Sequence, residues 1–117
     1  VLAMQTPILV LDEPTTGQDA GGVAMVAGVV EALASAGRTV IAITHDMDFA
    51  AEHFDRVVVM AKGEVLVDGA PATVFGEADA LARAAVEPPQ LFRLAAHLGW
   101  PDRPLTVEGF VDAFERR

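Results

Sequence analysis

The sequence predicts an α/β fold in which parallel strands are followed by a β-hairpin and then by a small helical tail. Two apolar runs, residues 8–11 and 39–44, are rich in β-branched residues and are typical of strands buried on both faces. An Ala- and Val-rich segment at about 20–36 lies between them, as a crossover helix does between parallel strands. Strand-like runs end before Gly76, and only helix-like patterns follow.

Composition and charge exclude several classes of function. The chain has 117 residues, which suits one ordinary domain. Its net charge of -9 repels phosphate backbones, so we expect no nucleic-acid partner. No apolar run approaches the roughly 20 residues of a membrane span, so no direct span is expected. The lack of cysteine excludes disulfides and thiolate chemistry.

The N-terminal elements follow in order. Residues 1–5 resemble the last turn of a helix, and we expect the chain to be a piece of a longer protein. The helix at 20–36 has a single charge, Glu31, so it is expected to be largely covered, and Gly37 is predicted as its C-cap.

The middle of the chain predicts a short helix, a hairpin and a second short helix. Residues 48–54 form the first helix, with acidic residues near its start. Residues 57–60 and 64–67 flank a turn that contains Gly63, the pattern of a β-hairpin. Pro71 is expected to open the helix that ends near Phe75.

The tail, residues 77–117, contains two patterns typical of amphipathic helices. The apolar residues of the first recur at i, i+3, i+4 and i+7, and they are Leu91, Leu94, Ala95 and Leu98. Thr106 is predicted to cap the second helix. The apolar stripe of that helix consists of Val107, Phe110, Val111 and Phe114. These stripes are expected to pack on each other, on the α/β part, or on a second subunit.

Polar residues follow both predicted parallel strands. Asp12 and Glu13 come after the first strand and His45 after the second, and parallel strands end at the same edge of a sheet, so the three should converge. Two neighbouring carboxylates also tend to raise each other's pKa. The residues alone leave purely structural roles open. The acids could be solvent-exposed, the histidine could be bonded to a carbonyl, and Asp19 could be a helix N-cap.

Three segments resemble ATP-binding-cassette (ABC) ATPases. ILVLDEPT resembles the Walker B segment, TGQD the D-loop and TVIAITHD the switch-histidine segment, in the order of that family. DRVVVMAKGEVLVDGAPATVF resembles its closing strands and helix. The resemblance implies that residues 1–76 are the C-terminal part of a P-loop NTPase domain. Residues 77–117 are then a separate helical tail with a possible role in subunit association.

The resemblance also implies a role for each site residue. Asp12 would hold Mg²⁺ through water, and Glu13 would polarise or deprotonate the attacking water. His45 would contact the γ-phosphate of ATP. Asp19 and Gln18 would belong to the D-loop at a dimer interface, although the family usually has an apolar residue at the position of Gln18. His53 and His97 are expected to be surface or packing residues.

Two further features concern activity and subfamily. The phosphate loop, the signature motif and the Q-loop glutamine do not occur in this sequence, so we expect these residues alone to bind ATP weakly and not to hydrolyse it. THDMDFAAEHFDRV, the hairpin and the tail resemble the ATPases of energy-coupling-factor importers, including the cobalt and nickel uptake ATPases.

That subfamily implies an ATP-hydrolysing subunit, dependent on ATP and Mg²⁺, that energises uptake of a metal ion or vitamin. Its partners would be a second ABC ATPase subunit, in a homodimer or heterodimer, and a transmembrane coupling subunit. Its place would be peripheral, at the cytoplasmic face of the cell membrane. Two alternatives stay open: an ABC ATPase of DNA maintenance, and a non-catalytic interaction or dimerisation module.

Overall fold

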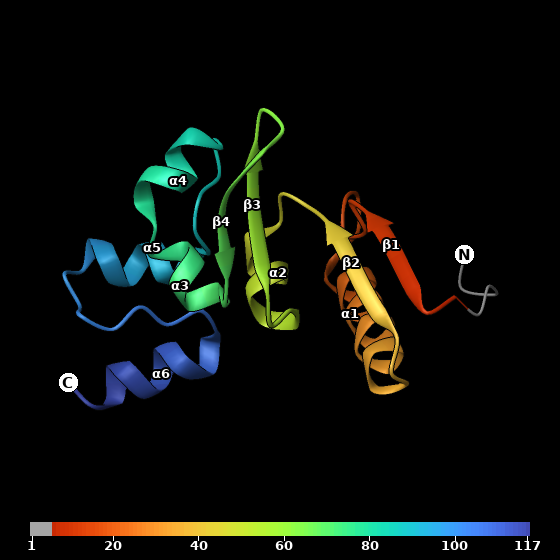
Figure 1. Ribbon diagram of the computed structural model, residues 1–117. Helices are drawn as coiled ribbons and strands as arrows, with labels where there is room; N and C mark the ends of the chain where they lie inside the picture. The colour runs from red at the N-terminus through yellow and green to blue at the C-terminus, as the bar shows by residue number, and fades with distance from the viewer. Residues whose placement is uncertain (1–5) are drawn as a thin grey trace. The chain divides into compact units, whose positions relative to one another are not determined.

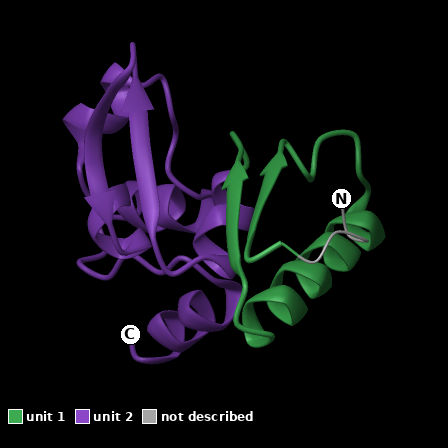
Figure 2. Ribbon diagram, turned by 45° about the vertical axis from the view of Figure 1, so that its right-hand side comes forward, with its two compact units in different colours: residues 1–46 green, residues 47–117 purple. Residues whose placement is uncertain are grey.

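The computed structural model describes residues 6–117, and over this range the chain forms strands and helices in two compact units. Unit 1 ends at Asp46 and unit 2 comprises Met47–Arg117 (Figures 1 and 2). Each unit contains its own two-stranded sheet. The helical turn expected at residues 1–5 lies outside the described residues.

Unit 1 is a βαβ arrangement. It consists of β1 (Ile8–Asp12), α1 (Ala20–Ser35) and β2 (Thr39–Ile43). The two strands pair in parallel along their whole length, as the apolar runs and the intervening helix predicted. The backbone N–H of Glu13 donates to the carbonyl of Ile43 over 2.7 Å, which continues the ladder one residue past β1.

Helix α1 is less covered than expected. Its buried residues are Ala27 and Val30, whereas Met25 is among the exposed apolar side chains. The expectation of a largely covered helix is therefore wrong for residues 6–117, since a two-stranded sheet is wide enough to cover only one stripe. The helix ends with Ala36 as C-cap, and Gly37 follows with a φ of +83°, which glycine adopts without steric cost.

The sheet of unit 1 has one packed face and one exposed apolar face. Leu9, on the packed face, is only 4% exposed. The residues of the other face keep between 48% and 56% of their surface exposed, and they are Ile8, Val10, Ile41 and Ile43. Burial on both faces, which the continuous apolar runs predicted, is thus not found within the described chain.

Unit 2 begins with a helix and a hairpin, followed by helices only. Strands β3 (Val57–Ala61) and β4 (Glu64–Gly69) are antiparallel, and Lys62 and Gly63 both have positive φ in the turn between them. Two such residues are typical of a two-residue hairpin turn, so the predicted hairpin is confirmed. The helices are α2 (Met47–His53), α3 (Pro71–Phe75), α4 (Ala78–Arg83), α5 (Gln90–His97) and α6 (Val107–Glu115).

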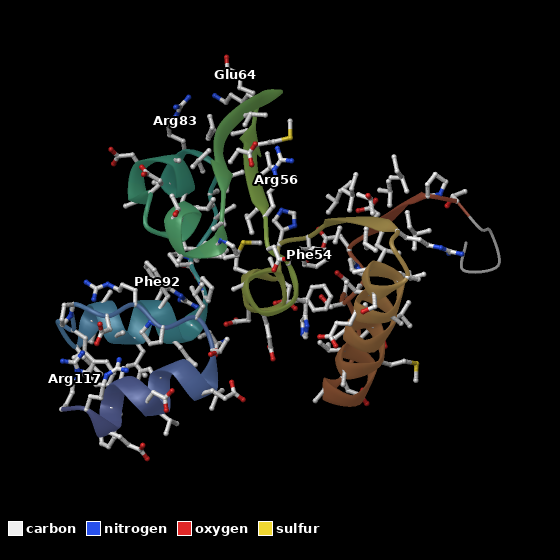
Figure 3. All side chains as sticks on the ribbon, turned by 60° about the horizontal axis from the view of Figure 1, so that its bottom comes forward. Phe54, Arg56, Glu64, Arg83, Phe92 and Arg117 are labelled. Atoms are coloured by element: carbon white, nitrogen blue, oxygen red, sulfur yellow. The ribbon has the colours of Figure 1, made fainter. Side chains whose placement is uncertain are left out.

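The core of unit 2 joins the hairpin to the helices that follow it. Val59 of β3 packs with Val74 and Phe75 of α3 and with Leu81 of α4. Near the hairpin turn, the guanidinium of Arg83 approaches the Glu64 carboxylate at 4.0 Å (Figure 3). The core therefore crosses the expected boundary between residues 1–76 and 77–117. That boundary stays a prediction about domains, whereas packing divides the chain after Asp46.

The last two helices contact each other, and an aromatic cluster joins α6 to the segment that follows α5. Ala95 of α5 and Ala113 of α6 are buried. The Trp100 ring stacks on Phe110 at 4.9 Å. The guanidinium of Arg117, which is labelled in Figure 3, lies 4.3 Å from the Trp100 ring centroid. Much of the two predicted apolar stripes stays exposed: Leu94, Leu98, Val107, Val111 and Phe114. Across residues 6–117, none of the helices has the length and apolar character that crossing a bilayer requires.

Candidate active site

The loops that follow β1 and β2 bring Glu13 and His45 together. Oε1 of Glu13 lies 2.7 Å from Nδ1 of His45. The Glu13 side chain is 33% exposed and that of His45 is 86% exposed, so both are open to solvent. The convergence predicted from the two strand ends is therefore present for this pair.

The contact also indicates which group donates the hydrogen bond. An ionised carboxylate can only accept hydrogen bonds, so Nδ1 of His45 is the donor. This hydrogen bond is the main cause that lowers the pKa of Glu13 below its ordinary value of 4.5. The expectation that a neighbouring acid raises this pKa is therefore wrong. Glu13 is ionised at neutral pH and can accept a proton or a hydrogen bond.

The backbone at Glu13 is strained. Its φ is +48°, in the left-handed region that costs a residue with a side chain about 1–2 kcal/mol. Directly after it, the N–H of Thr16 donates to the Glu13 carbonyl at 3.2 Å, and the N–H of Gln18 donates to Thr15 at 3.1 Å. The chain thus turns sharply at the end of β1. Such strain is common at functional sites, where surrounding contacts hold it in place.

Asp12 is the last residue of β1 and is exposed at the same edge of the sheet. Residues 6–117 contain no group of three or more His, Cys, Asp or Glu side chains arranged to hold a metal ion. A single exposed carboxylate nevertheless suits Mg²⁺, which keeps several waters and takes one or two protein carboxylates together with phosphate oxygens. The role of Asp12 as a magnesium ligand stays a prediction.

Asp19 is the N-cap of α1. Its Oδ1 accepts a hydrogen bond of 2.8 Å from the backbone N–H of Gly22. The capping interpretation is thus the one that the described residues support directly. Gln18 is exposed in the preceding turn. Roles for both residues at a dimer interface stay predictions.

Sequence reasoning missed two residues that join the same loops, Thr15 and Asp46. Oγ1 of Thr15 donates to Oδ2 of Asp46 at 3.0 Å. Each residue lies three positions after a strand end, Asp12 or Ile43, and these two ends are register partners. In the sequence, this equal spacing from the two strand ends was the signal that could have paired them. Their residue types gave no hint, because threonine and aspartate are ordinary turn residues.

A hollow of about 660 Å³ in unit 2 is a separate feature. Its walls include Phe75, Phe92, Arg93 and Arg103, and none of the candidate site residues lines it. His53 is mostly buried and its ring lies 5.1 Å from that of Phe49, which agrees with a packing role. The reactive groups therefore gather at the strand ends of unit 1, not in the hollow.

No family profile matches the chain, but individual relatives do. It is 37% identical over 117 residues to the energy-coupling factor transporter ATP-binding protein EcfA2 of Streptococcus sanguinis, covering 96% of this chain and 42% of that protein. It is 46% identical over 98 residues to a Methanosarcina acetivorans protein provisionally named an ABC transporter ATP-binding protein, covering 84% of this chain and 16% of the relative. The chain thus spans less than half the length of each.

A solved structure gives the same result for the fold. The structure of cbiO1 from Clostridium perfringens, described as part of the ABC transporter complex cbiONQ, matches with a TM-score of 0.59 and 34% identity. The match covers 84% of this chain and 38% of that chain. By sequence and by fold, the chain belongs to the ATP-binding proteins of ABC transporters, of the energy-coupling-factor type, and corresponds to a C-terminal part of them.

Proposed function

We propose that the chain is part of an ATP-hydrolysing subunit of an ABC importer that energises uptake of a metal ion or a vitamin. The observation that carries this proposal is the 2.7 Å contact between Glu13 and His45 at the common edge of two parallel strands. Ligands of open α/β sheets bind at this edge. The relation to EcfA2 supports the importer class.

Glu13 is the general base in this proposal. Phosphoryl transfer requires the protein mainly to position groups and to stabilise charge. The hydrogen bond from His45 uses one acceptor position of the Glu13 carboxylate, and further lone pairs are available for the attacking water. The lowered pKa of Glu13 keeps the carboxylate ionised, so it can receive a hydrogen bond from that water.

His45 positions the phosphate end of ATP. Its Nδ1 is engaged with Glu13, so only Nε2 is left for a phosphate oxygen. A phosphate oxygen is an acceptor, which requires Nε2 to carry a hydrogen. The ring would then donate one hydrogen bond to Glu13 and one to the phosphate.

The remaining groups concern magnesium and the partner subunits. Asp12 would hold Mg²⁺ through water, and the bound ion supplies positive charge to the phosphates. Asp19 and Gln18 would face a second ATPase subunit. The exposed stripes of α5 and α6, which include Leu94 and Phe114, offer apolar surface for subunit association. A transmembrane coupling subunit would place the protein at the cytoplasmic face of the membrane.

A chimera tests the proposal. Residues 6–117 replace the aligned residues of EcfA2 from Streptococcus sanguinis, to which the chain is 37% identical. We expect the chimera to hydrolyse ATP with magnesium, and Glu13→Gln to lower kcat by about 100-fold or more, as loss of a general base does. Glu31→Gln, on the exposed surface of α1, is the matched control and should leave kcat unchanged.

The 117-residue chain is measured beside the chimera. We expect it to bind ATP weakly and to release no more phosphate than the buffer does. Hydrolysis by the chain that vanishes with Glu13→Gln would contradict the expected inactivity. An active chimera that is indifferent to Glu13→Gln would contradict the assignment of the general base.

A further inference from the structure

The two site loops are joined by a partly buried hydrogen bond as well as by the exposed contact of Glu13 with His45. Thr15 is 8% exposed, and its hydroxyl donates to the Asp46 carboxylate at 3.0 Å. The backbone N–H of Asp46 in turn donates to Oγ1 of Thr44 at 2.9 Å. We name the hydrogen bond between Thr15 and Asp46 the clasp.

The clasp is better suited than the exposed pair to fix the distance between the loops. Exposed charged side chains gain little from pairing, because solvent screens them and ordering them costs entropy. The His45 side chain, at 86% exposure, is in that situation. A buried hydroxyl bonded to a carboxylate makes a stronger, charge-assisted hydrogen bond and is costly to leave unpaired.

The clasp also lies where it can orient both members of the pair. On one loop, Glu13 is held on one side by its N–H bond to Ile43 and on the other by the clasp at Thr15. On the second loop, His45 lies between Thr44 and Asp46, which are bonded to each other. Each side chain of the pair therefore projects from backbone that is fixed on both sides.

We propose that Thr15 and Asp46 are positioning residues that hold the Glu13 carboxylate and the His45 imidazole in contact. The inference rests on the proposed function, since positioning matters for catalysis only where this pair acts on ATP. The contact itself can be measured without ATP, in the 117-residue chain.

Nuclear magnetic resonance of labelled histidine rings tests the contact. At a pH well above the ordinary histidine pKa of about 6.5, the nitrogen shifts report which ring nitrogen carries the hydrogen. We expect His45 to carry the hydrogen on Nδ1. Thr15→Val should move the nitrogen shifts toward those of a histidine without this contact, in which both neutral tautomers are present. Thr15→Ser, which keeps the hydroxyl, should retain the original signal. The rings of His53 and His97 report whether the rest of the chain is unchanged.

Asp46 provides the second arm, in case Thr15→Val does not fold. Asp46→Ala removes the acceptor and should shift the His45 ring as Thr15→Val does, whereas Asp46→Asn keeps an acceptor oxygen and should not. Adding Thr15→Val to Asp46→Ala should shift the ring no further, because Asp46→Ala has already removed the acceptor of the clasp. An unshifted His45 ring in a folded Asp46→Ala or Thr15→Val chain overturns the proposal.

The chimera with EcfA2 gives the catalytic readout. Thr15→Val should lower kcat by about 10- to 100-fold with KM little changed, which is the loss expected from misplacing catalytic groups. Thr15→Ser should restore kcat. If the chimera does not hydrolyse ATP while the His45 shifts behave as expected, the proposed function fails and the clasp stands. If the chimera depends on Glu13 but not on Thr15 or Asp46, the clasp fails alone.

Discussion

Units 1 and 2 are held together in different ways. Between residues 6 and 46, unit 1 has three buried apolar residues, Leu9, Ala27 and Val30, and its loops are joined by polar side chains. Unit 2 has a connected apolar core around Phe75, to which Val59, Val74 and Leu81 contribute. The candidate chemistry thus lies on the unit with the smaller core, where strand pairing and hydrogen bonds set the geometry. The other unit depends on close packing.

Truncation of the cores should give the largest difference between the units. Phe75 is 1% exposed within the connected cluster, so Phe75→Ala should lower the free energy of unfolding by about 3–5 kcal/mol. Leu9→Ala should lower the free energy of unfolding by about 2–3 kcal/mol, because α1 can move partly into the space that the lost side chain leaves. Urea unfolding followed by circular dichroism measures both. An equal loss from the two variants would contradict the contrast in packing.

Removal of the helix caps should lower the free energy of unfolding by a smaller amount, which should be similar in the two units. Asp19 caps α1 and Thr106 caps α6, each through a side-chain oxygen that accepts a backbone N–H. Asp19→Ala and Thr106→Ala should each cost about 1 kcal/mol in thermal or urea unfolding. Asp19→Asn and Thr106→Ser keep an acceptor and serve as controls. A much larger cost at Asp19 would indicate that this residue does more than cap its helix.

The smallest effect concerns acid titration. In unit 2, Arg56, which is labelled in Figure 3, donates two hydrogen bonds of 2.8 and 2.7 Å to the Asp68 carboxylate. These hydrogen bonds are the main cause that lowers the pKa of Asp68 below its ordinary value of 3.8. A lowered pKa means that stabilisation is present above pH 3.8 and is lost as the pH falls through the folded-state pKa. Arg56→Ala should raise the pKa of Asp68 in a carbon-detected titration. High salt should weaken the difference, because the pair is exposed.

Most elements were predictable because their signals are local. The apolar runs, the glycine in the hairpin turn and Pro71 each determine a local conformation, and the observed β1, β2, β3, β4 and α3 follow them. Coverage of the strands was not predictable in the same way. The apolar character of Val10 and Ile41 indicates a face that favours burial, but it does not say which segment covers that face.

The site was predictable in part for a similar reason. Parallel strand ends bring the loops that carry Glu13 and His45 to one edge of the sheet, and contacts within the loops then set the distance between the two side chains. The direction of the Glu13 pKa shift was not predictable from adjacency to Asp12. The chain turns at Glu13, where φ is +48°, so adjacency in sequence does not determine how the two carboxylates are placed, and the hydrogen bond from the next loop dominates the shift. Thr15 and Asp46 carried no signal beyond their equal spacing from the two strand ends.

The left-handed backbone at Glu13 has a consequence for protein engineering. A residue with a side chain pays about 1–2 kcal/mol there, whereas glycine adopts the same φ without that cost. A screen that rewards heat resistance alone would therefore enrich Glu13→Gly and would remove the carboxylate in doing so. Under the proposed function, a screen of the full subunit that also rewards transport would retain Glu13, so comparing the two enriched populations would test that proposal at this position.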